Sequence, residues 1–378
     1  MKTPANPFLI TGYHSPKYFC NRVDETKKLL EAIRNQRNTT LVSLRRMGKT
    51  GLIKHVFYNL AIKKEFSIHY MDLLPTSDLN GFVHEFGTAV LKTIEERTTN
   101  WINKIGQIFK TIRPIIKIDS LSGQPSISFD FRNQEEILYA LEEIFSFLKS
   151  FNKKVVIAMD EFQQIGKYPE PNVEALLRKH IQSMNNVSFI FSGSLKNVLL
   201  SMFGEYSKPF YQSTDILYLE KIDQSTYNGF IHKKFEMAKM KISADEINYI
   251  LTLTQNHTFY VQYMSNRLYS RKSRVIKKDL IDEVWSEILL EREGMFYNYR
   301  NLLTEFQFKL LKSIAKEKRI NQPYVKEFLR KYNLGTPSTI ATALKALLEK
   351  ELVTDENGTY FVQDIFLSSW LDINFPDY

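Results

Sequence analysis

The sequence predicts an α/β protein whose first half forms a parallel β-sheet with helices on both faces. Short apolar runs typical of buried strands occupy residues 39–44, 66–73, 155–160, 187–193 and 215–220. Between them lie segments with apolar residues every three or four positions, which predict helices at residues 50–65, 81–97, 134–150 and 173–184. Because neighbouring parallel strands need a crossover connection, this strand–helix alternation favours a parallel sheet.

The rest of the chain divides into an insertion and two further domains. Residues 115–131 alternate apolar and polar positions around a Ser-Gly-Gln-Pro turn, which predicts a β-hairpin inserted in the sheet domain. From about residue 221 the patterns are helical and strand signals vanish. Residues 302–378 contain three short helical segments and then a hairpin, which together predict a winged helix. We therefore expect a core at 1–220, a helical domain at 221–301 and a winged helix at 302–378.

Composition limits the functional classes. A chain of 378 residues predicts two or three domains, and it contains no apolar run of about 18 residues, so no membrane span is expected. Cys20 is the single cysteine, which excludes an internal disulfide and a multi-cysteine zinc site. The N-terminus lacks the apolar segment of a signal peptide, so a cytoplasmic location is expected.

Positive charge gathers near the N-terminus. The net charge is +9, and residues 1–64 alone hold 13 Lys and Arg against 3 Asp and Glu. The winged-helix segment, residues 302–378, holds 10 of each sign. The basic region suits nucleotide phosphates, nucleic acid or simple solubility.

A phosphate-binding loop is predicted between the first strand and the first long helix. The pattern is G-x-x-x-x-G-K-[ST]; Gly48, Lys49 and Thr50 supply its second half, and Ser43 stands at the first glycine. In such a loop the lysine contacts the β- and γ-phosphates and the hydroxyl of the last residue binds Mg²⁺. The residues expected to hold the nucleotide here are Ser43, Arg45, Arg46, Met47, Gly48, Lys49, Thr50 and Gly51.

Two later strands end in polar residues that suit the same site. Asp160 and Glu161 follow the apolar strand at residues 155–159, where Asp160 would hold Mg²⁺ and Glu161 would orient or deprotonate the attacking water. The next strand ends in Ser-Gly-Ser, and either Ser192 or Ser194 would contact the γ-phosphate. The loop and the carboxylate pair together predict a site for ATP and Mg²⁺.

The chain resembles a known family over nearly its whole length. The motifs SLRRMGKT (43–50), DEFQ (160–163) and SGS (192–194) are similar to those of the archaeal-type ATPases in the AAA+/STAND branch of P-loop NTPases. YFCNRVDE (18–25) resembles the N-terminal motif of that family, which implies that Arg22 lies near the nucleotide. The resemblance implies a P-loop ATPase core, an α-helical lid and a C-terminal winged helix.

Several positions depart from the family pattern. Asn21 and Ile365 replace a glycine and a proline, Ser213 stands where relatives often carry an arginine finger, and NHTFY (256–260) replaces a common lid motif. A missing arginine finger can slow hydrolysis by roughly 10³-fold or more. We therefore expect an ATP-binding, slowly hydrolysing switch that controls the positions of the lid and winged helix and acts on another protein.

The alternative is an ATP-regulated DNA-binding protein of the replication-initiator or transposition-ATPase type, with DNA bound by the winged helix or by the basic N-terminal region. The helix expected at residues 337–350 offers Ser338, Thr339, Thr342 and Lys345, without Arg, Asn or Gln for bidentate base contacts. Its domain is also neutral, so it supplies little counterion release on binding DNA. The sequence leaves assembly with further copies of the chain open.

Overall fold

The computed structural model describes residues 4–63, 65–91, 115–118 and 125–375. They form two compact units: residues 11–222, and residues 1–10 together with 223–378. Within this described part, no helix is both long enough and apolar enough to cross a membrane.

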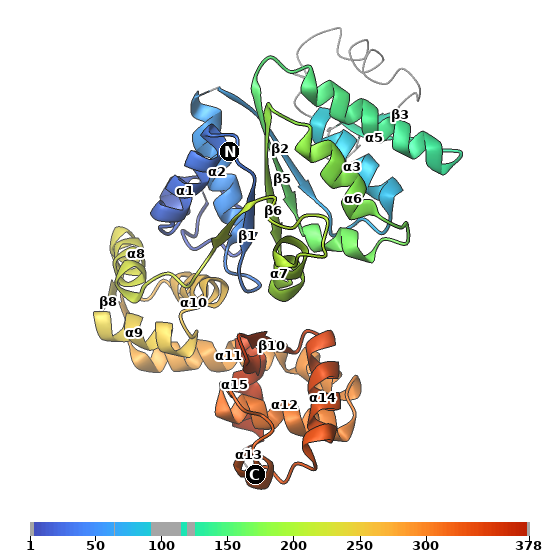
Figure 1. Ribbon diagram of the computed structural model, residues 1–378. Helices are drawn as coiled ribbons and strands as arrows, with labels where there is room; N and C mark the ends of the chain where they lie inside the picture. Colours follow the sequence, from blue (N-terminus) through green and yellow to red (C-terminus); the bar gives the residue numbers. More distant parts are fainter. Residues whose placement is uncertain (1–3, 64, 92–114, 119–124, 376–378) are drawn as a thin grey trace. The chain divides into compact units, whose positions relative to one another are not determined.

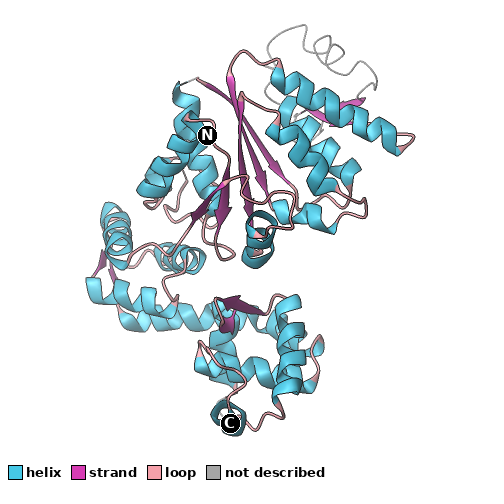
Figure 2. Ribbon diagram, viewed as in Figure 1, coloured by secondary structure: helices cyan, strands magenta, loops and turns pink. Residues whose placement is uncertain are grey.

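A five-stranded parallel sheet forms the centre of the first unit (Figures 1 and 2). Its strand order is β2-β5-β6-β1-β7, and every neighbouring pair is parallel. This confirms the parallel sheet predicted from the sequence. The strands are β1 (Thr39–Val42), β2 (Phe66–Asp72), β5 (Lys154–Asp160), β6 (Val187–Gly193) and β7 (Asp215–Tyr218).

Helices cover both faces of this sheet (Figure 1). On β5, Val156 and Ala158 join one apolar core, while Val155, Ile157 and Met159 join the other. This alternation is expected because successive strand residues point to opposite faces. The first core includes residues of α1 (Val23–Arg34) and α2 (Lys49–Lys63); the second includes residues of α3 (Leu79–Leu91), α5 (Gln134–Lys149), α6 (Val173–Gln182) and α7 (Lys196–Gly204).

The inserted hairpin is confirmed in its pairing. Strand β3 (Ile115–Ile118) pairs antiparallel with β4 (Pro125–Ser128). The expected turn at residues 119–124 lies outside the described residues, as do residues 92–97 of the helix expected at 81–97.

The second unit contains the helical domain, formed by α8 (Gln224–Met237), α9 (Ala244–Leu253), α10 (Thr258–Ser270) and α11 (Lys278–Asn301). The expectation that strands are absent between residues 221 and 301 is wrong. Strands β8 (Lys241–Ile242) and β9 (Val275–Ile276) form a parallel pair. Each has only two residues, which is too short to produce a period-2 sequence pattern.

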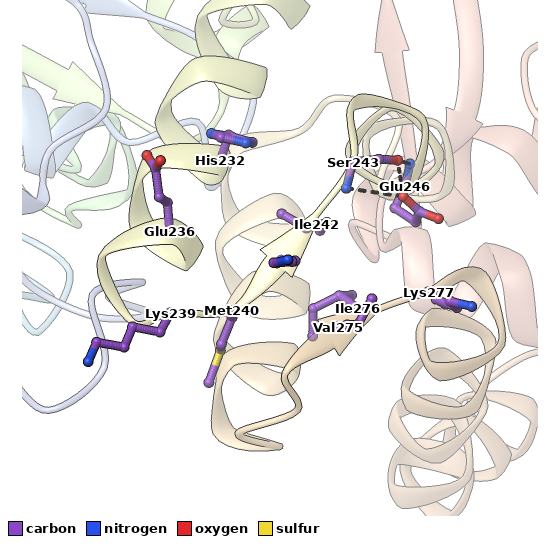
Figure 3. A pocket seen from close by; sticks show the side chains of 11 residues that line it. His232, Glu236, Lys239, Met240, Ile242, Ser243, Glu246, Val275, Ile276 and Lys277 are labelled. Carbon is purple, nitrogen blue, oxygen red and sulfur yellow. Dashed lines mark hydrogen bonds between the residues drawn. The ribbon is translucent and has the colours of Figure 1, made fainter.

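These two short strands border an open depression of about 670 Å³ (Figure 3). Its lining carries charges of both signs, with Lys239, Lys241 and Lys277 beside Glu236 and Glu246. The Glu246 side chain also accepts hydrogen bonds from Ser243 in the capping box that starts α9. The depression thus has no dominant charge for a ligand to match.

A winged helix forms the end of the second unit, as predicted. Strands β10 (Val353–Glu356) and β11 (Thr359–Val362) pair antiparallel, and the turn uses positive φ at Asn357 and Gly358. The sequence did not predict the last helix, whose Trp370 is buried. The helices are α12 (Glu305–Glu317), α13 (Lys326–Lys331), α14 (Pro337–Glu349) and α15 (Ile365–Asn374).

The N-terminal segment packs on the helical domain. Phe8 is buried against Phe230, Phe235 and Tyr269, and the Asn266 side chain donates a 2.6 Å hydrogen bond to the Phe8 carbonyl. The chain therefore passes between the two units twice, after residue 10 and after residue 222.

Candidate nucleotide site

The sheet brings three separate sequence motifs to one edge. Strands β5, β6 and β1 are adjacent and parallel, so their carboxyl ends lie together. Val42 pairs with Gly193, and Asp160 is the last residue of β5. The loop at 43–48, the carboxylates at 160–161 and the Ser-Gly-Ser segment at 192–194 therefore meet at the place where open α/β sheets bind ligands.

The backbone of the loop explains how it tolerates Ser43. Positive φ values occur at Arg46 (63°) and Gly48 (93°) but not at Ser43. The φ of Gly48 is one that L side chains rarely adopt, so glycine is needed there, whereas Ser43 adopts an ordinary conformation. Helix α2 then begins at Lys49, which leaves the free N–H groups of its first turn at the loop.

Lys49 is buried beside acceptors that carry no full charge. Its side chain is 6% exposed, and Nζ donates to Ser43 Oγ at 3.0 Å and to the Leu44 carbonyl at 3.2 Å. Burial lowers the pKa of Lys49 to about 8, although Glu161 and Asp160 partly oppose this shift. A bound anion would stabilise the ammonium form, so the site is electrostatically suited to phosphate.

Three hydroxyl groups converge on the buried carboxylate of Asp160. Thr50 Oγ1 and Tyr70 OH donate to Oδ2 at 2.6 and 2.8 Å, and Ser192 Oγ donates to Oδ1 at 2.5 Å. Burial and the nearby Asp160 raise the pKa of Tyr70, which keeps its hydroxyl protonated as a donor. The hydroxyl of Thr50 and the carboxylate of Asp160 are the hard oxygen ligands that Mg²⁺ prefers, so this pair fits that cation.

Glu161 is held by a different set of donors. Its Oε2 atom accepts hydrogen bonds from Gln163 Nε2 at 2.5 Å, from Ser194 Oγ at 2.8 Å and from the Ser194 N–H at 3.2 Å. The Glu161 backbone has a φ of 56°, in the left-handed region that non-glycine residues seldom adopt. Such strain persists only where surrounding contacts impose it, and it is frequent at functional sites.

Each residue of the Ser-Gly-Ser segment thus has its own neighbour in the site. Ser192 hydrogen bonds Asp160 and Ser194 hydrogen bonds Glu161. A Cβ atom at Gly193 would lie 1.9 Å from Gln163 Oε1, so a side chain there would displace Gln163. The predicted contact of Ser192 or Ser194 with the γ-phosphate stays a prediction, and no role was predicted for Gln163 or Tyr70. Gln163 lies in the quoted DEFQ motif, which was the available signal; Tyr70 lies within an ordinary strand pattern.

Arg22 contacts protein atoms beside the loop. Its buried guanidinium donates to the carbonyls of Glu220 (2.6 Å) and Met47 (3.3 Å) and to the Glu25 carboxylate (2.8 Å). Arg22 therefore connects the phosphate loop with Glu220, which lies two residues after the end of β7. Its expected contact with nucleotide stays a prediction.

The other predicted residues differ in their exposure. Arg45 and Arg46 are exposed, while Met47 is buried in the core under α2. Gly51 lies in the first turn of α2, where an added Cβ would be 3.5 Å from Phe19. Ser213, at the arginine-finger position, donates to the Phe210 carbonyl at 2.7 Å within its own turn.

The parallel sheet, the strand–loop–helix at Lys49 and the winged helix define a P-loop ATPase. A sequence model described as an ATPase domain predominantly from Archaea matches residues 19–262, and one described as a probable winged helix domain matches residues 294–373. The chain belongs to this archaeal-type ATPase family. A search of curated proteins found no match.

Solved structures agree on the fold. A Walker-type ATPase of Pyrococcus abyssi has a TM-score of 0.65 and 17% identity, with 97% of this chain and 99% of that chain covered. The ORC2 protein of Aeropyrum pernix, in ADPNP and ADP complexes, has a TM-score of 0.56 and 15% identity, with 98% of each chain covered. At these identities the likeness shows the fold alone.

Proposed function

We propose that the chain binds ATP with Mg²⁺ and hydrolyses it slowly, as an AAA+/STAND-like switch. One observation carries this proposal. At the carboxyl edge of the sheet, Lys49 and Thr50 lie near the carboxylates of Asp160 and Glu161, and each carboxylate accepts a hydrogen bond from a separate serine. The Aeropyrum relative, which was solved with ADPNP and ADP, supports the choice of nucleotide.

Each residue has a chemical task in this proposal. Lys49 and the N–H groups at the start of α2 neutralise charge on the phosphates, with residues 43–51 forming the loop around them. Thr50 and Asp160 would hold Mg²⁺, which would neutralise negative charge on the nucleotide. Glu161 accepts the proton of the attacking water, and Ser192 and Ser194 fix the two carboxylates.

We expect slow hydrolysis because Ser213 stands where relatives often carry an arginine finger. Ser213 cannot stabilise negative charge as an arginine finger does, and its hydroxyl is engaged in its own turn. The loss of such an arginine can cost roughly 10³-fold in rate. The candidates for a substitute cation are Arg178 and Lys196 of this chain and an arginine of a second copy of the chain.

The two places where the chain passes between the units support a switch in which the nucleotide site acts on the second unit. The guanidinium of Arg22 joins Met47 in the loop to Glu220, which lies three residues before the second unit begins at Asp223. At the other crossing, Phe8 anchors the N-terminal segment in the helical domain. We propose that nucleotide state changes the strain on these crossings and so the positions of the lid (221–301) and winged helix (302–378) relative to the sheet of the first unit. A cytoplasmic location stays a prediction.

The preferred partner is another protein. The alternative, ATP-regulated DNA binding, has support from the winged helix and from the basic residues 1–64. Against it, the wing itself carries Asp355 and Glu356, which would repel phosphates, and α14 exposes Lys345 beside Glu349. A contact surface for protein therefore suits this domain better.

Release of inorganic phosphate from ATP tests the proposal. Wild-type protein should show slow, Mg²⁺-dependent turnover, and Glu161→Gln should reduce it by about 10²-fold or more while ATP still binds, because the variant removes only the general base. Equal turnover in wild type and Glu161→Gln would refute the assigned mechanism. Capture of partners on the ATP-bound Glu161→Gln protein would then separate a protein partner from DNA.

A further inference from the structure

We propose that Gln163 is a positioning residue for the reaction, because it fixes the orientation of the Glu161 carboxylate. This inference rests on the proposed ATP hydrolysis and adds a residue to it. Its central observation is the 2.5 Å hydrogen bond from Gln163 Nε2 to Glu161 Oε2.

The hydrogen bonds divide the two oxygens of Glu161 into different roles. The donors from Gln163 and Ser194 that hold this side chain all reach Oε2. Within the described part of the chain, no donor to Oε1 is found. An anchored Oε2 leaves Oε1 as the oxygen that receives the proton of the water, so the O–H bond of the water breaks and an O–H bond forms at Oε1. The oxygen of the water bonds to the γ-phosphorus, and the bond from that phosphorus to the bridging oxygen breaks, so that ADP leaves with the electron pair.

The backbone around Gln163 fixes the direction of its side chain. Gln163 lies in the short 3₁₀ helix η2 (Phe162–Lys167). Phe162 on one side is buried against Phe191, Phe203 and Phe210, and Gln164 on the other side donates to the Thr76 carbonyl at 3.0 Å. Because both neighbours are anchored, Gln163 has little freedom to point elsewhere.

The amide of Gln163 is kept at a cost to stability. The residue is 5% exposed, and its Oε1 atom is buried without a hydrogen-bond partner among the described residues. A buried carbonyl without a donor is unfavourable, so an apolar side chain of similar shape would suit this space at least as well. Only the contact with Glu161 requires an amide here, and Gly193 provides the room that the amide needs.

The same element supplies a matched control. Gln164 is also a glutamine of η2 with a donating amide, but its hydrogen bond goes to Thr76 rather than to Glu161. We compare Gln163→Met with Gln164→Met in the full-length protein, measuring kcat, KM for ATP and Tm. Gln163→Met should lower kcat by about ten- to hundred-fold, because small misplacements of a catalytic group cost this much. Its KM should change less than about two-fold and its Tm should not fall, whereas Gln164→Met should retain kcat.

Two further variants separate positioning from folding. Gln163→Glu keeps the shape but replaces the donor by a like charge, so it should lose at least as much kcat. In a Glu161→Gln background, Gln163→Met should have no further effect, because the base that it positions is already gone.

Wild-type kcat in Gln163→Met, equal loss in Gln164→Met, or an additive loss in the double variant would overturn the inference. These outcomes differ from a failure of the proposed function, in which the wild-type protein itself would release no phosphate from ATP.

Discussion

The carboxyl edge of the sheet and the exposed face of α14 differ in how their polar side chains are held. At the sheet edge, Asp160 is buried and accepts from three hydroxyls, and Lys49 is buried with two acceptors. On α14, Ser338, Thr339 and Thr342 are exposed, and the Thr342 hydroxyl donates to its own helix at the Ser338 carbonyl.

This difference separates two kinds of site. Buried polar groups with fixed partners are costly to assemble and suit chemistry on a small ligand, because their geometry is set before the ligand arrives. Exposed side chains satisfied by their own helix impose no such geometry. The wing beside α14 is similar, since Glu356 pairs with Arg319 at 2.9 Å on the surface. The first region is therefore a catalytic candidate, and the second shows no such prearranged site.

Ser43→Gly tests whether the buried contacts of the loop affect binding. Ser43 Oγ accepts from Lys49 Nζ, and that hydrogen bond competes with phosphate for the ammonium group. Since a hydrogen bond contributes about 1 kcal/mol net, the variant should gain at most about five-fold in ATP affinity, measured by calorimetric titration. A loss of ten-fold or more would contradict this account and would mean that the hydroxyl of Ser43, and not only its backbone, contacts the nucleotide.

Lys345→Ala tests the exposed face and should have the smallest effect. Lys345 is exposed, and its ammonium lies 3.9 Å from the Glu349 carboxylate. We expect affinity for duplex DNA, measured by fluorescence anisotropy at several salt concentrations, to change by less than about two-fold. A decrease of about one in the salt slope would show that this lysine contacts a phosphate, and it would favour the DNA-binding alternative.

The sequence predicted those parts of the fold that depend on local patterns. The strands ending at Val42, Asp160 and Gly193 were predicted because apolar runs and polar ends are visible within a few residues. The two-residue strands β8 and β9 were missed because they are too short to show an alternation of apolar and polar residues. Helix α15 was not predicted, although Asp364 at its start is a residue type that commonly caps helices.

The site was predictable in its residue types but not in its contacts. That Asp160 and Glu161 belong together follows from their position at a strand end. That Tyr70 donates to Asp160 depends on the pairing of β2 with β5, and that Gln163 needs Gly193 depends on the neighbouring strand β6. Contacts of this kind arise from strand order and register, which a single sequence does not display.

Calorimetric titration of ATP in the presence of Mg²⁺ tests the central claim most directly. The account predicts that one ATP binds per wild-type chain. Lys49→Ala should lose at least about thirty-fold in ATP affinity, because it removes the ammonium partner of the bound phosphate, and the loss of one partner of a buried charge pair costs about 2 kcal/mol or more. Lys27→Ala, which removes the same charge from an exposed position on α1, should bind as wild type does. Equal ATP affinity in Lys49→Ala and wild type would contradict the assignment of this edge as the nucleotide site.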